Sequence, residues 1–175
     1  EYNKINNAFE FIGYLNGYKG LLKGYSVKLD DFSNINNLNN FGGSLLGNSR
    51  VKLTNIEDCI NNKYIENNQI PIEVAANQLM KDKIDILHTI GGDDTNTTAS
   101  DLVTYLNTKN YNITVVGLPK TIDNDVYPIK QTLGAYTAAE ETAKFFTNIV
   151  NENTTSSRHL IIHEIMGRNC GWLTA

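Results

Sequence analysis

Three apolar runs separated by segments of helical periodicity constrain the fold of this 175-residue chain more than any other feature. The runs are Ile84–Ile90, Ile113–Leu118 and Leu160–Ile165, and glycine or proline follows each of them within two residues. Between the runs, apolar residues recur at helical spacing over Thr97–Asn107 and over 138–149. Parallel neighbouring strands need a crossover helix, so the alternation predicts an α/β fold with a mostly parallel sheet and helices on both faces.

The part of the chain before the first run gives weaker signals. Ala8–Leu15 is apolar enough for a strand, and Gly17–Gly20 is typical of a turn. The Asn-rich stretch Asp31–Asn40 fits either a polar loop or a short amphipathic helix. A helix is predicted over Ile72–Met80, where five apolar residues follow helical spacing.

The composition excludes several classes of protein. With 15 basic and 19 acidic residues, the formal net charge is −4, which leaves no basic field to attract nucleic acid or an anionic membrane surface. No apolar run approaches the roughly 18 residues that cross a bilayer. Cys59 and Cys170 lie far apart in unlike contexts, so we expect no disulfide framework and no cysteine metal site. We therefore expect a cytoplasmic protein without nucleic-acid or membrane partners.

A polar cluster follows each apolar run, where open parallel sheets bind their ligands. In the first cluster, Gly91 and Gly92 allow a phosphate to approach the backbone at the start of a helix. Asp93 and Asp94 come next, and they would repel a phosphate unless a divalent cation such as Mg²⁺ lay between them. The alternative is a strand-ending turn with an Asp cap and no ligand.

The second cluster combines a cation with two carboxylates in one short loop. Lys120, Asp123 and Asp125 stand there together with polar neighbours, Thr121 and Asn124. Phosphoryl transfer to a hydroxyl needs a carboxylate to accept the proton, cations to neutralise the transferring group, and donors to orient the substrates. The alternative is a solvated loop whose carboxylates cap Thr132 or Gly134.

The third cluster, Met166–Arg168, follows the third run. The Gly167 backbone and the Arg168 guanidinium offer donors for hydroxyls or for a phosphate. A solvated arginine at a helix start explains the same residues without any ligand.

Taken in order, these clusters resemble the phosphofructokinase family. The matching segments are Phe41–Arg50, Gly91–Asn96, Gly117–Asp125 and His163–Gly171, and Gly17–Leu21 resembles an earlier turn of the family. The resemblance implies a Rossmann-like three-layer sandwich, of which this chain holds part. The family's N-terminal glycine-rich strand-turn and its C-terminal sugar-phosphate-binding part have no counterpart in this sequence. We therefore expect residues 1–175 to be a fragment of a phosphofructokinase domain.

The resemblance also implies roles for the residues of the second cluster. Asp123 would be the base that takes the proton from the 1-hydroxyl of fructose 6-phosphate. Thr121 and Asp125 would position the sugar and the transferring phosphoryl group. The reaction implied is the reversible transfer that gives fructose 1,6-bisphosphate in glycolysis and gluconeogenesis.

Further roles follow from the same resemblance. Asp93 would be the carboxylate associated with Mg²⁺, while Gly92 and Arg50 would contact the phosphoryl donor. The residues implied to hold the sugar are Met166, Gly167 and Arg168. Arg158 lies nearest to the family's arginine that reaches into a neighbouring subunit's site, and the family assembles as homo-oligomers, so a dimer or tetramer is expected.

Two positions indicate the phosphoryl donor. Family members that use ATP carry glycine where this chain has Asp94 and Lys120, whereas members that use diphosphate carry Asp and Lys there. The Asp94 carboxylate would crowd and repel an ATP α-phosphate, and the Lys120 ammonium would compensate a compact diphosphate. The sequence therefore predicts diphosphate as the donor. The alternatives are an ATP-dependent phosphofructokinase and a non-catalytic regulatory subunit, which would be expected to have lost Asp123.

Overall fold

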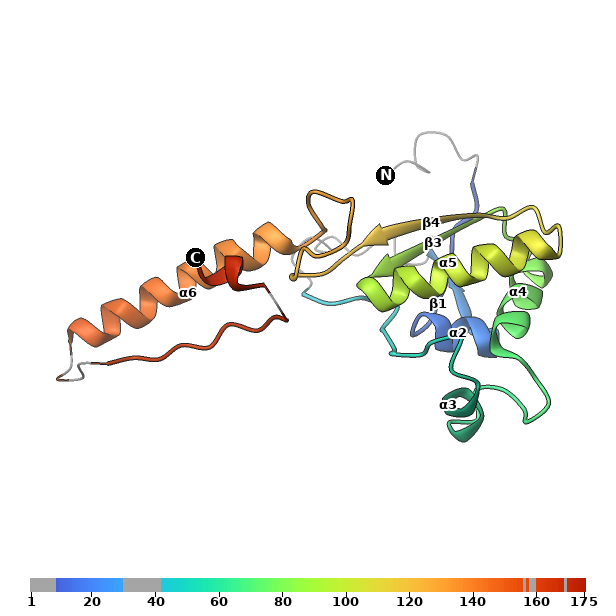
Figure 1. The fold of residues 1–175 in the computed structure, drawn as a ribbon, viewed down its shortest axis with the longest axis horizontal. Helices are drawn as coiled ribbons and strands as arrows, with labels where there is room; N and C mark the ends of the chain where they lie inside the picture. The colour runs from blue at the N-terminus through green and yellow to red at the C-terminus, as the bar shows by residue number, and fades with distance from the viewer. Residues whose placement is uncertain (1–8, 30–41, 156, 158–159, 169) are drawn as a thin grey trace. The chain divides into compact units, whose positions relative to one another are not determined.

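The computed structural model describes residues 9–29, 42–155, 157, 160–168 and 170–175. The chain divides into two compact units, one made of Glu1–Leu87 with Ser100–Thr114 and the other of His88–Ala99 with Val115–Ala175. The elements in chain order are β1 (Ile12–Tyr14), α2 (Tyr18–Lys23), β2 (Ser26–Lys28), α3 (Ile56–Asn61), α4 (Pro71–Lys81), β3 (Ile86–Gly91), α5 (Asp93–Thr108), β4 (Thr114–Pro119), α6 (Ala135–Thr154) and the short 3₁₀ helix η3 (Gly171–Thr174) (Figure 1).

The first strands form an antiparallel pair in which Gly13 lies opposite Val27. The strand predicted over Ala8–Leu15 is therefore present but short. The turn predicted at Gly17–Gly20 is wrong, because α2 begins at Tyr18. Gly17 has a φ of 60°, which glycine adopts without strain, and this reversal lets the helix start at once.

The core of the first unit is built around α4, which confirms the helix predicted over Ile72–Met80. Pro71 occupies the start of the helix, where its missing N–H costs nothing. The fully buried side chains of α4 include those of Ala75, Ala76 and Leu79. The other fully buried leucines of this unit are Leu21, Leu53, Leu102 and Leu106.

The strands β3 and β4 pair with each other, and α5 connects them. The Thr114 N–H donates to the Asp85 carbonyl at 2.9 Å, and the Lys120 N–H donates to the Gly91 carbonyl at 2.8 Å. Both bonds join residues with the same separation along the chain, so the two strands run parallel, as their arrows show in Figure 1. The predicted strand–helix–strand unit is confirmed, although α5 begins at Asp93 rather than at Thr97.

The strand predicted over Leu160–Ile165 is wrong within the described part of the chain, where this segment joins no sheet. An apolar run becomes a strand only when a neighbour supplies hydrogen bonds, and here Leu160 and Ile162 are 78% and 88% exposed. The helix predicted after the second cluster is confirmed as α6, but its Phe145 is 57% exposed instead of buried. The Asp31–Asn40 prediction lies outside the described residues.

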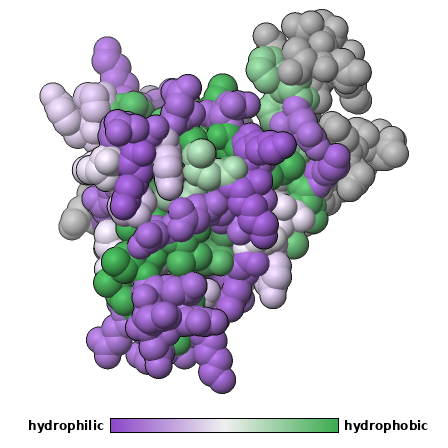
Figure 2. Space-filling model, turned by 90° about the vertical axis from the view of Figure 1, so that its right-hand side faces the viewer, coloured by the Kyte–Doolittle hydropathy of each residue, from purple (hydrophilic) through white to green (hydrophobic). Residues whose placement is uncertain are grey.

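The surface mixes polar and apolar side chains. Figure 2 shows one face on which hydrophilic residues dominate and hydrophobic residues lie between them. Among the described residues, no helix combines the length and the apolar character that crossing a membrane requires.

Candidate functional site

The turn after β3 leads directly into α5. Gly91 ends the strand and Asp93 begins the helix, so Gly92 is the single residue between the two elements. Among the described residues, a Cβ atom placed on Gly92 would meet only the Thr121 side chain, at 4.0 Å. The backbone of this turn is therefore open toward the loop after β4, and the N–H groups of the first helical turn border the opening.

A side-chain amide fixes the geometry of this turn. Asn96 Nδ2 lies 2.9 Å from the carbonyl oxygens of both Gly91 and Gly92. Its Oδ1 faces Gly117 of β4, where an added Cβ would approach that oxygen to 2.5 Å. Asn96 thus links the ends of both parallel strands, a role that the sequence did not indicate.

The loop after β4 starts beside the same turn. The Lys120 N–H donates to the Gly91 carbonyl, and on the other side Lys120 forms a parallel bridge with Leu133, whose N–H donates to the Pro119 carbonyl at 2.9 Å. The Lys120 backbone is therefore held between two segments, while its side chain is exposed to solvent.

Asn124 fixes the conformation of the middle of this loop. It has a φ of 56°, a left-handed conformation that Asn tolerates better than most residues. Its Oδ1 accepts from the Thr132 N–H at 2.8 Å, and the buried Thr132 hydroxyl donates to the Thr121 carbonyl at 2.7 Å. The alternative interpretation expected the carboxylates of this loop to cap Thr132 or Gly134, but the side-chain amide of Asn124 makes the contact with Thr132. Asp123 and Asp125 therefore remain available for other roles.

Asp123 is held through its main chain and its side chain. Its N–H donates to Thr121 Oγ1 at 3.1 Å, and its carbonyl accepts from Trp172 Nε1 at 3.1 Å. The Oδ1 atom accepts from the Arg168 N–H at 3.2 Å. The Cys170 thiol lies near the carboxylate, since both approach the same side of Gly167, and burial followed by the nearby Asp123 raises the pKa of the thiol.

An open cavity of about 640 Å³ lies beside Asp123. Its lining residues are Ile122, Asp123, Glu164, Ile165, Met166, Gly167 and Arg168. The structure therefore brings the predicted base together with the three residues predicted to hold the sugar. Glu164 adds a carboxylate that the sequence did not single out.

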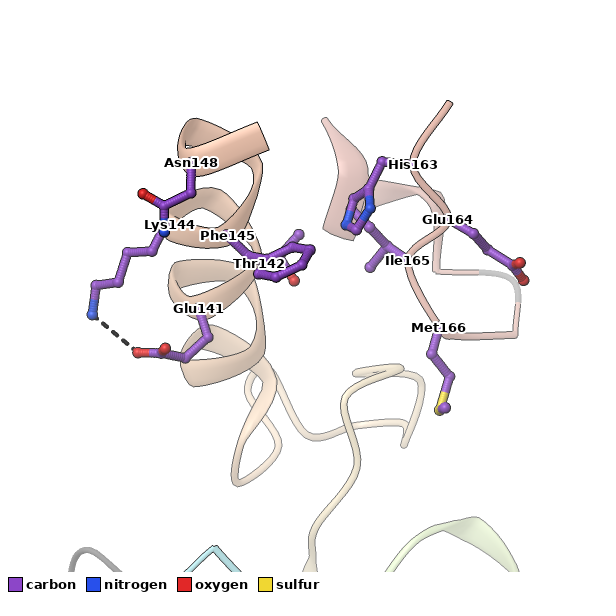
Figure 3. Close-up of a pocket in the computed structure, with 9 residues that line it drawn as sticks. All are labelled: Glu141, Thr142, Lys144, Phe145, Asn148, His163, Glu164, Ile165 and Met166. Carbon is purple, nitrogen blue, oxygen red and sulfur yellow. Dashed lines mark hydrogen bonds and ion pairs between the residues drawn. The ribbon is translucent and has the colours of Figure 1, made fainter. Parts of the chain in front are cut away.

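A second cavity, of about 480 Å³, lies between α6 and the segment His163–Met166 (Figure 3). His163 points toward Phe145 there, with ring centroids 5.3 Å apart, and Lys144 pairs with Glu141 at 3.0 Å. Of the predicted site residues only Met166 lines this cavity. The cavity on the Asp123 side is therefore the candidate site.

The remaining predicted residues occupy other positions. Asp93 and Asp94 are exposed in the first turn of α5, and Asp125 is exposed in the loop after β4. Arg50 is an exposed residue of the first unit, so its contact with a phosphoryl donor stays a prediction. Arg158 lies outside the described residues.

The acidic residues fit a metal that is shared with a ligand. No group of three or more His, Cys, Asp or Glu side chains among the described residues could hold an ion without help. Mg²⁺ prefers one or two carboxylates together with phosphate oxygens and water. The adjacent carboxylates Asp93 and Asp94 match that donor set, because a phosphate at the Gly92 turn would supply the other oxygens.

Several contributors to this site were missed from the sequence. Asn96, Thr132, Cys170 and Trp172 act through contacts with residues distant along the chain or with main-chain atoms. The sequence signal that was present is Asn124 itself, since Asn within a loop favours the left-handed conformation that the structure shows there.

A glycine turn between a parallel strand and a helix, facing a carboxylate loop after the next strand, is typical of α/β proteins that bind phosphate compounds at their strand ends. The family model described as phosphofructokinase matches residues 2–175. The chain therefore belongs to the phosphofructokinase family, and the α/β fold expected from the resemblance is confirmed.

Known relatives give a finer comparison. The chain is 57% identical over 176 residues to the pyrophosphate--fructose 6-phosphate 1-phosphotransferase of Methylomonas methanica and 51% identical to that of Mastigamoeba balamuthi. It is 34% identical to ATP-dependent 6-phosphofructokinase 2 of Clostridium perfringens. These matches cover 97–99% of this chain but only 43–44% of the relatives, so the chain spans less than half of their length.

Solved structures show the same fold. Phosphofructokinase from Saccharomyces cerevisiae matches with a TM-score of 0.70 and 28% identity, over 97% of this chain and 23% of that one. Pyrophosphate-dependent phosphofructokinase from Marinobacter aquaeolei matches with a TM-score of 0.71 and 26% identity, over 95% of this chain and 39% of that one.

Proposed function

We propose that the full-length protein transfers a phosphoryl group from diphosphate to the 1-hydroxyl of fructose 6-phosphate, giving fructose 1,6-bisphosphate and phosphate. The observation that carries the proposal is the Asp123 carboxylate, which lines one cavity with Met166, Gly167 and Arg168. The names of the relatives that share 51–57% identity with the chain support the same reaction.

Each step has a residue suited to it. Asp123 takes the proton from the sugar hydroxyl as that oxygen attacks the terminal phosphorus of the diphosphate. The Arg168 N–H donates to Oδ1 of Asp123, and Asn124 Oδ1 accepts from the Thr132 N–H in the same loop. These two hydrogen bonds fix the carboxylate before the substrate arrives. Thr121 and Asp125 orient the reacting groups, and the leaving phosphate departs toward the Lys120 ammonium.

Mg²⁺ is the cofactor that the proposal includes. Asp93 would hold the ion, with Asp94 beside it and the diphosphate oxygens completing its shell. Bound there, the metal neutralises part of the charge on the diphosphate. Gly92 and the first turn of α5 contribute main-chain N–H groups to the same anion.

Diphosphate is proposed as the donor because of two exposed side chains. Asp94 places negative charge at the turn where a nucleotide's α-phosphate would lie, and Lys120 places positive charge on the neighbouring loop. A compact diphosphate anion gains from the positive charge of the lysine, whereas a nucleoside triphosphate would also meet the negative charge of the Asp94 carboxylate.

An assay that offers the two donors separately tests this assignment. The full-length protein, with fructose 6-phosphate and Mg²⁺, should form fructose 1,6-bisphosphate with diphosphate and not with ATP. The double variant Lys120→Gly, Asp94→Gly should lose about tenfold or more in kcat/KM for diphosphate, the effect of roughly 1.4 kcal/mol. Lys109→Ala, which removes a lysine of the first unit, serves as the control. Turnover with ATP alone would overturn the donor assignment.

The remaining elements of the proposal concern assembly and location. We place the enzyme in the cytoplasm as a homo-oligomer, a dimer or tetramer, with residues 1–175 forming part of one phosphofructokinase domain. The family resemblance supports this arrangement. Sedimentation of the full-length protein measures its oligomeric state directly.

A further inference from the structure

Arg168 and Trp172 both contact Asp123. The Arg168 N–H donates to Oδ1 of the carboxylate at 3.2 Å, and the Trp172 indole N–H donates to the Asp123 carbonyl at 3.1 Å. Cys170 lies between them along the chain, and its carbonyl accepts the Leu173 N–H at 2.9 Å at the start of η3. The position of Cys170 is therefore set by the same short helix that presents Trp172.

Gly167 shows how closely the thiol and the carboxylate approach each other. A Cβ atom added to Gly167 would overlap Cys170 Sγ and would lie 3.3 Å from Asp123 Oδ1. Sulfur and carboxylate oxygen thus flank the same side of one backbone carbon. Only glycine leaves room for both neighbours, and Cys170 itself is 7% exposed.

The charges around the sulfur determine its state. Burial raises the pKa of the Cys170 thiol most, followed by its hydrogen bond to Asp123 and by the charges of Asp123 and Asp125. The Arg168 N–H reaches the same carboxylate without removing its charge. The thiol therefore stays protonated at neutral pH and is able to donate a hydrogen bond, since only the S–H form can donate.

We propose that Cys170 is a positioning residue for Asp123, whose thiol donates to the carboxylate and turns it toward the substrate hydroxyl. This inference rests on the proposed function, in which Asp123 is the base. A thiol is a weak donor, so it orients the carboxylate while leaving it able to accept a proton. A charged donor at the same place would hold the carboxylate more firmly and make it a poorer base.

Substitution of Cys170 in the full-length enzyme tests the proposal. Cys170→Ala should lower kcat about tenfold, as expected when a hydrogen bond to a charged group is lost, with little change in KM for either substrate. Cys170→Ser keeps a donor at this position and should recover most of the loss.

The chain contains a matched control. Cys59 is buried in the first unit, and its thiol lies 3.6 Å from the Lys52 carbonyl. Cys59→Ala removes an equivalent buried thiol and should change stability without changing kcat. A role for Cys170 in packing alone would make its alanine variant behave in the same way.

Infrared spectroscopy supplies a readout that does not need turnover. A thiol that donates to a carboxylate shows an S–H stretching band at lowered frequency, and Cys170→Ala identifies that band by removing it. Asp123→Asn should shift the band upward, because a neutral amide accepts more weakly than a carboxylate.

The possible outcomes separate this inference from the proposed function. If the wild type turns over and Asp123→Ser does not, but Cys170→Ala keeps the wild-type kcat, the positioning role is wrong and the proposed function stands. An S–H band that ignores Asp123→Asn would also overturn the inference. A wild type that is inactive with diphosphate and with ATP overturns the proposed function.

Discussion

Two half-buried aspartates, one in each unit, are held in different ways. Asp82 follows α4, and its Oδ2 atom accepts from the Tyr14 hydroxyl at 2.7 Å and from Gln78 Nε2 at 2.8 Å. Asp123 lies in the loop after β4, where its side chain accepts from a main-chain N–H at 3.2 Å and lies near a thiol. Two short side-chain hydrogen bonds hold the first carboxylate, whereas a longer main-chain hydrogen bond holds the second.

The difference separates a structural carboxylate from a reactive one. Short bonds from a hydroxyl and an amide tie Asp82 to β1 and to α4, so this carboxylate joins elements of the first unit. Asp123 is held by two main-chain hydrogen bonds and by the Arg168 N–H at its carboxylate, and it borders an open cavity. A carboxylate that has to accept a proton benefits from fixed direction and modest stabilisation, which is the arrangement around Asp123.

Removal of the Asp123 carboxylate should have the largest effect. In the full-length enzyme, Asp123→Ser should reduce kcat by about 10²- to 10⁴-fold, the usual contribution of a general base, while the unfolding midpoint in urea changes little. Phosphoryl transfer that persists undiminished would show that Asp123 is not the base and that the two aspartates do not differ as described.

The corresponding change at Asp82 should have the opposite pattern. Asp82→Ala leaves the Tyr14 hydroxyl and the Gln78 amide without their common acceptor, so the free energy of unfolding should fall by about 2 kcal/mol. We expect kcat and both KM values to stay at wild-type levels, measured by the coupled assay. A large loss of kcat in a folded variant would contradict the structural role.

Asn124 tests how much of the Asp123 geometry comes from its own loop. Asn124→Gly permits the observed φ of 56° but removes the side-chain hydrogen bonds to Thr132. The variant should therefore lose about 1 kcal/mol of folding free energy, and its kcat should be lower than that of the wild type. Thr132→Ser, which keeps the hydroxyl donor, is the matched control. Full activity in Asn124→Gly would assign the orientation of Asp123 to the segment from Gly167 to Trp172 alone.

The smallest expected effect is a loss of folding stability at alkaline pH, which involves a different titrating group beside each aspartate. Burial and contact with Asp82 raise the pKa of Tyr14, as burial and contact with Asp123 raise that of Cys170. A group with a raised folded pKa contributes stability that is complete below its unfolded pKa and is lost as pH rises toward the folded value. Stability should therefore decline above about pH 8.5 for the thiol and above about pH 10 for the tyrosine.

Urea unfolding at successive pH values measures both parts of this decline. Cys170→Ala should weaken the first part, and Tyr14→Phe should weaken the second. Cys59, whose burial also raises its thiol pKa, contributes to the first part and is removed by Cys59→Ala. Stability that increases over this pH range would contradict the assignment.

Elements whose apolar run has a partner in the described structure were predictable from the sequence. β3, β4 and α5 follow from their apolar patterns, and the two strands form because each supplies hydrogen bonds to the other. The segment Leu160–Ile165 has the same composition but no strand beside it among the described residues, and sequence alone does not reveal the neighbour. At Gly17 a positive φ begins a helix, whereas glycine content alone indicates only a turn.

The site followed the same division. Asp123, Lys120 and the Gly92 turn carry chemistry that restricts the residue type, so they were found from the sequence. Contacts between distant positions were not: Arg168 and Trp172 lie 45 and 49 residues from Asp123. Nothing in the local pattern around Cys170 indicates a carboxylate at its side.

Trp172 gives this loop an intrinsic optical label. It is the one tryptophan of the 175 residues, and its indole N–H bonds the carbonyl of Asp123. Indole emission responds to changes in the hydrogen bonding and solvation of the ring. A sugar phosphate that enters the cavity beside Asp123 would therefore change the fluorescence of this chain, which makes ligand binding and loop movement measurable without any attached dye.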